Sequence, residues 1–281
     1  MSRLPLAVLA LVLSSPFWDL GHPLWEVDDA RYAEVPREVH EAGWPLIPTL
    51  NGMDYVEKPP LIYWLGAASY GVFGVSEHAA RLPLALASLA GLAGVWWLGA
   101  WLFSAAVGQA AALILGTMLI YSGLSHMITP DMTLTATLVW ATALGLRVLH
   151  RPDDARWAAP AAWLCIAAAF LSKGLIAVLL PGLWVCALAV WEPKLRTGFR
   201  RLILGPGPLL ALALVGLTAA VSVVALRGGL ALADFGPPAA DLNPLERAAL
   251  SVYLLANRTA LATPASADAA PVQFAVAAGQ N

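Results

Sequence analysis

The sequence predicts an all-α fold, a polytopic bundle of transmembrane helices with amphipathic surface helices in the first loop outside the membrane. Of the 281 residues, 59% are hydrophobic and only 12% are charged, whereas soluble domains carry about 25% charged residues. The apolar residues also gather in successive runs that approach or reach the roughly 20 residues needed to cross a bilayer. A water-soluble fold of this length could not bury so much apolar surface.

The net charge and the cysteines narrow the functional classes. A formal net charge of −2 argues against a nucleic acid as partner, because nucleic-acid-binding domains carry a basic surface. Cys165 and Cys186 both lie within apolar runs, which is typical of small buried hydrophobic residues rather than of a disulfide framework.

The first apolar run, Leu4–Trp18, is preceded by Arg3 and predicts a transmembrane helix over residues 1–18. The run is short, so a cleaved signal peptide is the alternative. Pro16 and the bulky Phe17 and Trp18 follow where a small-residue cleavage site would stand, which favours a retained helix. Both interpretations send the next segment, residues 19–81, across the membrane.

About six further helices are predicted to form a transmembrane bundle over residues 82–226. Their expected ranges are Leu82–Phe103, Ala105–Ser125, Met132–Leu149, Trp157–Leu171, Leu175–Trp191 and Leu202–Leu226. Residues 227–281 are rich in Ala and Pro and lack sustained apolar periodicity, so this tail is expected to be poorly ordered.

The short loops predict the orientation. Two of them carry clusters of basic residues, namely Arg147, Arg151 and Arg156, and then Lys194, Arg196, Arg200 and Arg201. The positive-inside rule places these loops in the cytoplasm. Residues 19–81, 126–131 and 172–174 then share the outer face, and the protein is expected in a bacterial inner membrane with a periplasmic or extracellular active face.

The long outer loop predicts two helices on the membrane surface. The first begins at Asp28-Asp29 and ends before Gly43, and Pro36 within it is expected to kink or split it. The second runs from Pro59-Pro60 to about Gly74, which is too short to span a bilayer.

Asp28 and Asp29 have two interpretations. A carboxylate at the start of a helix commonly caps the free backbone N–H groups. From spacing alone this capping role is favoured, and the alternative is a catalytic carboxylate at the membrane surface. Two adjacent acids exceed what one cap needs, so both roles can coexist.

Glu57-Lys58-Pro59-Pro60 predicts an anion site. Proline suits the first helical turn, so Lys58 adds a full positive charge to a helix N-terminus that already attracts anions, phosphate above all. The alternative is a lysine that extends to the membrane surface and pairs with Glu57 or a lipid headgroup.

Two later segments place ionisable residues at the outer boundary. Asp131 follows Thr129-Pro130 and either caps its helix or lies at a functional site. Lys173, between Ser172 and Gly174, interrupts an apolar stretch. Ionisable residues in such positions are functional candidates, with a lysine extended to the membrane surface as the alternative.

These segments in this order resemble the GT-C class of membrane glycosyltransferases. The similarity rests on Asp28-Asp29-Ala30-Arg31-Tyr32-Ala33-Glu34, Arg37-Glu38, Glu57-Lys58-Pro59-Pro60 with Tyr63-Trp64, Thr129-Pro130-Asp131 and Ser172-Lys173-Gly174. The group it resembles comprises the lipid A aminoarabinose transferases and related polyprenyl-phosphate-sugar transferases, kin of the protein O-mannosyltransferases. The resemblance extends from about Trp25 to Trp191.

The resemblance implies sugar transfer from a polyprenyl-phosphate donor to a lipid, glycan or protein acceptor. It makes Asp28 the leading catalytic carboxylate, with Asp29 beside it. The donor phosphate is assigned to Lys58, Arg31 and Lys173, and supporting roles to Glu57, Asp131 and Tyr32. Some relatives use a divalent cation, for which Asp28, Glu57 and Asp131 offer oxygen ligands, but the sequence establishes no cofactor.

The chain differs from the family pattern in two respects. The family often has Asp-Glu where this chain has Asp28-Asp29, and it continues through further spans and a soluble outer domain. This chain is therefore expected to be a fragment, a frameshifted product or a degenerate member, which binds the donor and transfers sugar poorly or not at all. The alternative is a non-catalytic scaffold, lipid-binding or transporter-like membrane protein that keeps the fold, although a transporter would place more polar residues in mid-membrane.

Overall fold

The computed structural model describes residues 3–24, 27–45, 47–55 and 57–227. The chain divides into two units, Met1–Val221 and Ser222–Asn281. Of the second unit only the end of helix α11 is described, so all that follows concerns the first. The predicted tail, residues 227–281, lies outside the described residues except for Arg227.

The described residues are almost entirely helical, which confirms the predicted fold class. The long helices of the bundle are α4 (Glu77–Leu102), α5 (Ala105–Thr117), α7 (Pro130–His150), α8 (Ala155–Lys173), α9 (Ile176–Trp191) and α11 (Gly207–Arg227). The remaining helices are α1 (Arg3–Ser14), α2 (Val27–Glu41), α3 (Leu61–Phe73), α6 (Leu119–Leu124) and α10 (Arg196–Leu204). Short 3-10 turns cover Ser15–Phe17, Pro152–Asp154 and Pro193–Leu195.

Three described segments are long and apolar enough to cross a membrane, namely Glu77–Leu102, Pro130–His150 and Pro193–Thr218. Shorter apolar helices cover Val8–Phe17, Leu61–Phe73, Ala105–Thr117 and Ile176–Leu188. The expected count of about six crossing helices in the bundle therefore remains a prediction.

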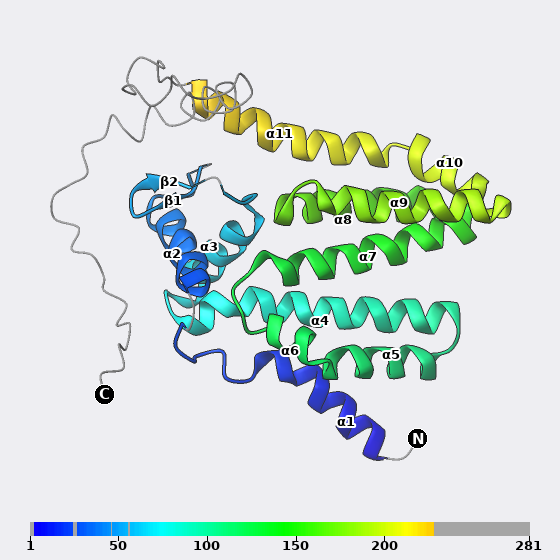
Figure 1. Cartoon of the computed structure of the whole chain (residues 1–281), viewed down its shortest axis with the longest axis horizontal. Coiled ribbons are helices and arrows are strands. Elements are labelled where there is room, and N and C mark those ends of the chain that lie inside the picture. Colours follow the sequence, from blue (N-terminus) through cyan, green and yellow to red (C-terminus); the bar gives the residue numbers. More distant parts are fainter. Residues whose placement is uncertain (1–2, 25–26, 46, 56, 228–281) are drawn as a thin grey trace. The chain divides into compact units, whose positions relative to one another are not determined.

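Small residues let the bundle helices approach closely. Helix α4 packs against both α5 and α7, and α7 packs against α8 (Figure 1). A Cβ atom added to Gly108 would lie 2.3 Å from the carbonyl oxygen of Trp96, and one added to Gly94 would lie 2.7 Å from Val139. Such contacts between helix backbones are the usual means of helix association in lipid.

Two of the expected spans are divided, which corrects their predicted ranges. The segment expected as Ala105–Ser125 breaks at Met118, whose backbone is extended, and Tyr121 of α6 then donates a hydrogen bond of 2.7 Å to the Ser88 carbonyl of α4. The segment expected as Leu202–Leu226 breaks after Leu204, where a Gly-Pro-Gly-Pro sequence follows. Proline disfavours helical geometry in the residue before it, which accounts for this second break.

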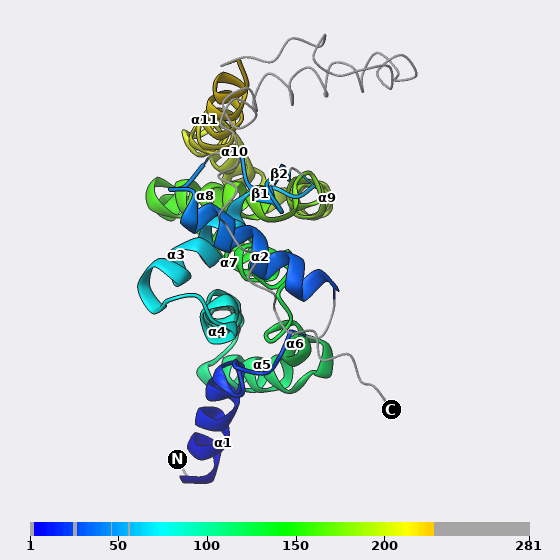
Figure 2. The ribbon, with the colours of Figure 1, turned by 90° about the vertical axis from the view of Figure 1, so that its left-hand side faces the viewer.

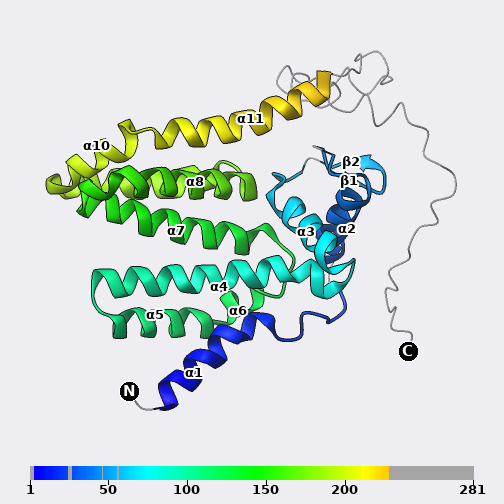
Figure 3. The same cartoon turned by 180° about the vertical axis from the view of Figure 1, so that it is seen from behind.

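Helices α2 and α3 lie across one end of the bundle and share a buried core with α4. Figure 2 looks onto α2 from that end, and Figure 3 shows the same layer from behind. The expected split at Pro36 is wrong, because α2 continues through this residue, and the expected kink stays a prediction. Pro36 is buried against α3, where a Cβ on Gly66 would lie 2.7 Å from its ring, and this packing holds the helix on either side of the proline.

A small antiparallel hairpin, β1 (Thr49–Leu50) and β2 (Met53–Asp54), follows α2. Asn51 and Gly52 form its turn with φ angles of 55° and 71°, as the mirror-image turns of hairpins require. Glu38 of α2 holds the turn, because its carboxylate accepts hydrogen bonds from the Thr49 hydroxyl and from the backbone N–H groups of Asn51 and Gly52. The Asn-Gly pair was the sequence signal for this hairpin, which the sequence analysis above does not predict.

The layer formed by α2 and α3 lies at the end of the bundle where α4, α7 and α9 begin and α8 ends (Figure 1). The loops that carry the arginine clusters lie at the opposite end. Segments distant in sequence therefore meet beside α2 and α3, and the contacts of their polar side chains define the candidate site.

Candidate active site

Asp28 and Asp29 are adjacent in α2 but point into different surroundings. The Asp28 side chain is 55% exposed and pairs with Arg31 one turn later. The Asp29 side chain is only 8% exposed. One of its oxygens accepts a 3.1 Å hydrogen bond from Arg81, and the other accepts a 2.7 Å hydrogen bond from the backbone N–H of Ile128. The two acids predicted as a catalytic pair therefore have different environments.

Arg81, which the sequence analysis does not single out, is the buried residue that connects the segments around Asp29. Its side chain is fully buried in the first part of α4. Besides Asp29, it donates to four backbone carbonyls, those of Leu20, His22, Pro23 and His126, at 2.6–3.2 Å. The guanidinium thereby connects the segment before α2 with the segment before α7. A buried charge is tolerated only with such complete pairing.

A second, exposed cluster gathers Asp28, Arg31, Tyr55, Glu57 and Lys58, and is called the Arg31 cluster below. Arg31 pairs with Asp28 and donates to the Glu57 carboxylate at 2.9 Å and to the Tyr55 hydroxyl at 3.2 Å. Tyr55 in turn donates to Glu57 at 2.5 Å, and Lys58 Nζ lies 3.2 Å from the other Glu57 oxygen. Arg31 therefore joins α2 to the segment before α3.

The electrostatics of the Arg31 cluster keep its carboxylate and guanidinium ionised. The hydrogen bond from Tyr55, and then that from Lys58, lowers the pKa of Glu57. The bond to Tyr55, together with Asp28 and Glu57, raises the pKa of Arg31. The cluster therefore holds two basic side chains, Arg31 and Lys58, which pair with the two carboxylates Asp28 and Glu57 at a half-exposed surface.

Aromatic rings support the cluster from below. Tyr32 and Tyr63 stack with their ring centroids 6.1 Å apart, and Tyr55 meets Tyr63 edge-on at 6.0 Å. Tyr32 is buried, and burial raises its pKa to about 12. Tyr32 thus has a neutral, supporting position under Arg31. Tyr55 was missed by the sequence analysis, although it lies only two residues before Glu57.

Asp131 and Lys173 pair with each other at the same end of the bundle. Asp131 is in the first turn of α7 and Lys173 in the last turn of α8, and their side chains are 36% and 35% exposed. Within the described ranges, neither forms an ion pair or hydrogen bond with the Arg31 cluster. The structure thus brings the predicted site residues to one end of the bundle but divides them among the Arg31 cluster with Tyr32, the Asp131–Lys173 pair, and Asp29, which is buried with Arg81.

The three predicted oxygen ligands for a divalent cation do not fit one in this arrangement. Asp28 and Glu57 both bind Arg31, and Asp131 binds Lys173 on a different helix pair. In the part of the chain that is described, no group of three or more His, Cys, Asp or Glu side chains could hold a metal ion.

In the comparisons with known proteins, the family model and the similar proteins are all glycosyltransferases. Residues 57–225 match the family model described as dolichyl-phosphate-mannose-protein mannosyltransferase. The chain is 30% identical over 200 residues to undecaprenyl phosphate-alpha-4-amino-4-deoxy-L-arabinose arabinosyl transferase 1 of Sodalis glossinidius, covering 68% of this chain and 34% of that protein. It is 30% identical over 181 residues to the protein of the same name from Proteus mirabilis, covering 62% and 32%.

Similar solved structures come from a protein of the same kind. The chain superposes on ArnT from Cupriavidus metallidurans bound to undecaprenyl phosphate with a TM-score of 0.66 and 30% identity, covering 78% of this chain and 40% of that one. The apo structure of the same protein gives a TM-score of 0.67. The chain spans about a third of the length of the curated relatives it matches. Because the family model matches more than half of the chain, this chain belongs to the dolichyl-phosphate-mannose-protein mannosyltransferase family of membrane glycosyltransferases.

Proposed function

We propose that this chain carries the donor site of a glycosyltransferase that takes a sugar from a polyprenyl phosphate on the outer face of the membrane. The observation that carries the proposal is the Arg31 cluster, in which a reachable carboxylate, Asp28, and two cations, Arg31 and Lys58, converge from α2 and the segment before α3. The relatives named after undecaprenyl-phosphate-linked 4-amino-4-deoxyarabinose support this donor class.

In this proposal Lys58 and Arg31 bind the donor phosphate. Lys58 is 33% exposed and its ammonium contacts only Glu57 among the described charged groups, so a phosphate can approach it from the open side. Arg31 offers a planar, charged donor set that suits phosphate oxygens. Lys173 pairs with Asp131, and we assign this pair to the rim of the site, with Glu57 and Tyr32 as supports of the two cations.

The reaction breaks the bond between the sugar C1 and the donor phosphate and forms a bond between C1 and an acceptor oxygen. Polyprenyl phosphate leaves with the bonding electrons, and Lys58 and Arg31 stabilise its negative charge. If the acceptor is a hydroxyl, Asp28 accepts its proton. If the acceptor is a phosphate, Asp28 instead stabilises positive charge that develops on the sugar. Asp29 takes no part, because both its oxygens are bound beneath the site.

The acceptor that best suits a site between surface helices and a membrane is a lipid, and lipid A is our leading candidate. The arginine-rich loops at the opposite end of the bundle support an inner-membrane protein with a periplasmic site. The outer-loop layer, residues 19–81, and the bundle, residues 82–226, then act as donor site and membrane anchor.

Asp28→Asn tests the catalytic part of the proposal. The test uses membranes that contain the chain, undecaprenyl phosphate for binding, and undecaprenyl-phosphate-linked 4-amino-4-deoxyarabinose with lipid A for transfer. We expect the variant to bind undecaprenyl phosphate as the wild type does and to lower any transfer by about 10²–10⁴-fold. Unchanged transfer by Asp28→Asn would contradict the catalytic role of Asp28.

A further inference from the structure

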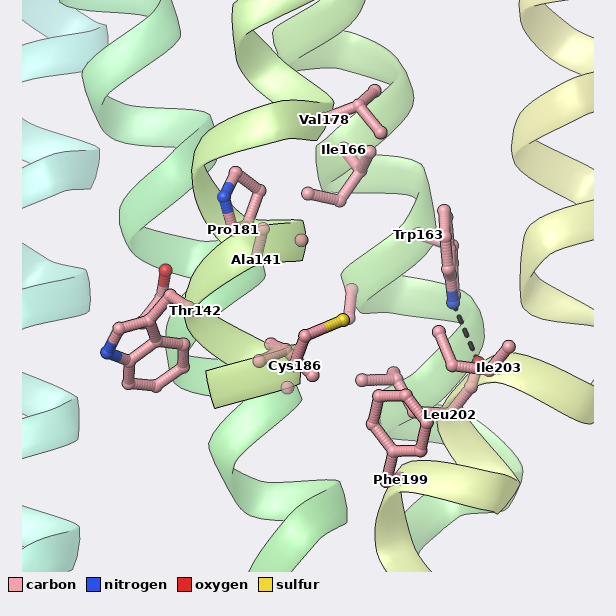
Figure 4. A pocket seen from close by; sticks show the side chains of 15 residues that line it. Ala141, Thr142, Trp163, Ile166, Val178, Pro181, Cys186, Phe199, Leu202 and Ile203 are labelled. Atoms are coloured by element: carbon pink, nitrogen blue, oxygen red, sulfur yellow. Dashed lines mark hydrogen bonds between the residues drawn. The ribbon is translucent and has the colours of Figure 1, made fainter. Parts of the chain in front are cut away.

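A cavity of about 110 Å³ lies far from the Arg31 cluster, among α7, α8, α9 and α10. Its walls are almost wholly apolar (Figure 4), and they include Trp163, Ile166, Val178, Pro181, Phe199 and Leu202. The indole N–H of Trp163 is not free to bind a ligand, because it donates to the Leu202 carbonyl at 2.8 Å. Apolar cavities of about 150 Å³ take up a benzene molecule, so this one suits a stretch of hydrocarbon.

The cavity opens at a side of the bundle where apolar side chains are exposed. Val178, Trp184 and Ile203 line it and are 37–39% exposed. The neighbouring Leu179 and Leu183 of α9 are more exposed still. In a bilayer these side chains contact acyl chains, so hydrocarbon is the material available to fill the opening.

Helix α10 connects this cavity to a basic surface. Gly198 sits directly on the end of α7, where an added Cβ would lie 2.5 Å from the Leu149 Cα atom. Phe199, Leu202 and Ile203 line the cavity. Arg196 and Arg200 are exposed and stand three residues before Phe199 and Ile203, respectively, which places each one turn from a cavity wall.

The charge around α10 is strongly positive. The two loops, residues 147–157 and 192–201, contain seven Lys or Arg residues and three acidic residues. Two of these three acids are already paired, Asp154 with Arg147 at 2.8 Å and Asp153 with Arg201 at 3.1 Å. Among the described residues, neither Arg196 nor Arg200 has an acidic partner within ion-pair distance, so both are available to an external anion.

We propose that this corner of the bundle is a binding site for an anionic glycerophospholipid of the leaflet at the arginine-rich end. A segment of one acyl chain enters the cavity, and the headgroup phosphate binds Arg196 and Arg200. Basic pockets between membrane helices recognise anionic headgroups in this way. The site is separate from the proposed donor site and does not depend on it.

The test is native mass spectrometry of the purified chain in detergent, titrated with phosphatidylglycerol or with zwitterionic phosphatidylcholine. We expect one retained phosphatidylglycerol and little phosphatidylcholine. Arg196→Gln/Arg200→Gln should lower phosphatidylglycerol retention by about tenfold or more. The matched control Arg151→Gln/Arg156→Gln removes two charges at the same end of the bundle and should change retention less than about twofold.

A second pair of variants tests the cavity itself. Gly145 lines it, and an added Cβ there would meet no atom within 4 Å, so Gly145→Leu fills the space without a clash at Cβ and should abolish retention. Gly216→Leu on α11 is the control, because its Cβ also meets nothing and it does not line the cavity. If Gly145→Leu is not monodisperse, Gly182→Leu replaces it on the same grounds.

Four results would overturn the proposal. Equal retention of the two lipids would remove the headgroup site. An equal loss in both arginine pairs would show diffuse attraction in place of a site. Unchanged retention in the filled-cavity variant, or no retained lipid in the wild type, would show that the acyl chain does not bind here and that another apolar partner covers the cavity.

Discussion

Asp29 and Arg81 lie 52 residues apart in the sequence and form a buried ion pair of 3.1 Å beneath the candidate site. The adjacent Asp28 instead pairs with Arg31 at the surface. One of the two aspartates therefore connects the outer-loop layer to the bundle, and the other is exposed at the surface.

This division predicts different costs for two neighbouring substitutions. Asp29→Asn leaves the buried Arg81 charge without its counter-ion and should destabilise the chain by about 3–5 kcal/mol. Asp28→Asn, at an exposed pair, should cost no more than about 1 kcal/mol. Thermal unfolding of both variants in the same detergent measures the difference. Equal melting temperatures for the two variants would refute the structural role of Asp29.

Asp54 in β2 predicts a pH dependence of stability. Burial raises the pKa of Asp54 from 3.8 to about 6. The folded state thus holds its proton at pH values where the unfolded state releases it, so its contribution favours folding below about pH 4 and is lost as the pH rises to about 6. Relative to the wild type, Asp54→Asn should show a smaller loss of stability across this window, measured by unfolding at pH 4 and pH 7. Parallel pH curves would contradict the buried carboxyl.

The proposed orientation predicts opposite accessibility of the two ends of the bundle. Met53 is 70% exposed in β2, and the Asp153 side chain is 98% exposed between α7 and α8. In a background without Cys165 and Cys186, Met53→Cys should react with an impermeant thiol reagent in intact spheroplasts, and Asp153→Cys only after lysis. Reaction of both positions before lysis would invalidate the orientation.

Much of the candidate site could be predicted from the sequence, because helix starts can be recognised from a few neighbouring residues. Asp28, Arg31, Glu57 and Lys58 stand at helix starts, and the alternation of spans brings such starts to one face. The structure also shows the pairing of Lys58 with Glu57 that the sequence left as an alternative.

The remainder depends on tertiary contacts that spacing does not reveal. No local pattern indicates that Asp29 turns inward to Arg81, since its partners come from α4 and from Ile128. The break at Met118 follows no proline, and the hydrogen bond between Tyr121 and Ser88 that accompanies it joins two helices. At Pro36 the local signal for a helix break fails, because α2 continues through this proline, which packs closely against Gly66.

The central claim is that Lys58 and Arg31 bind a polyprenyl phosphate, and the most direct test is the affinity of the purified chain for undecaprenyl phosphate. Lys58→Ala should weaken binding about ten- to hundredfold, as expected for the loss of a charge-assisted hydrogen bond. Lys58→Arg should retain part of the affinity because the charge remains. Lys194→Ala, at the opposite end of the bundle, is the control and should bind as the wild type does. Equal affinity of the wild type and Lys58→Ala would contradict the proposed donor site.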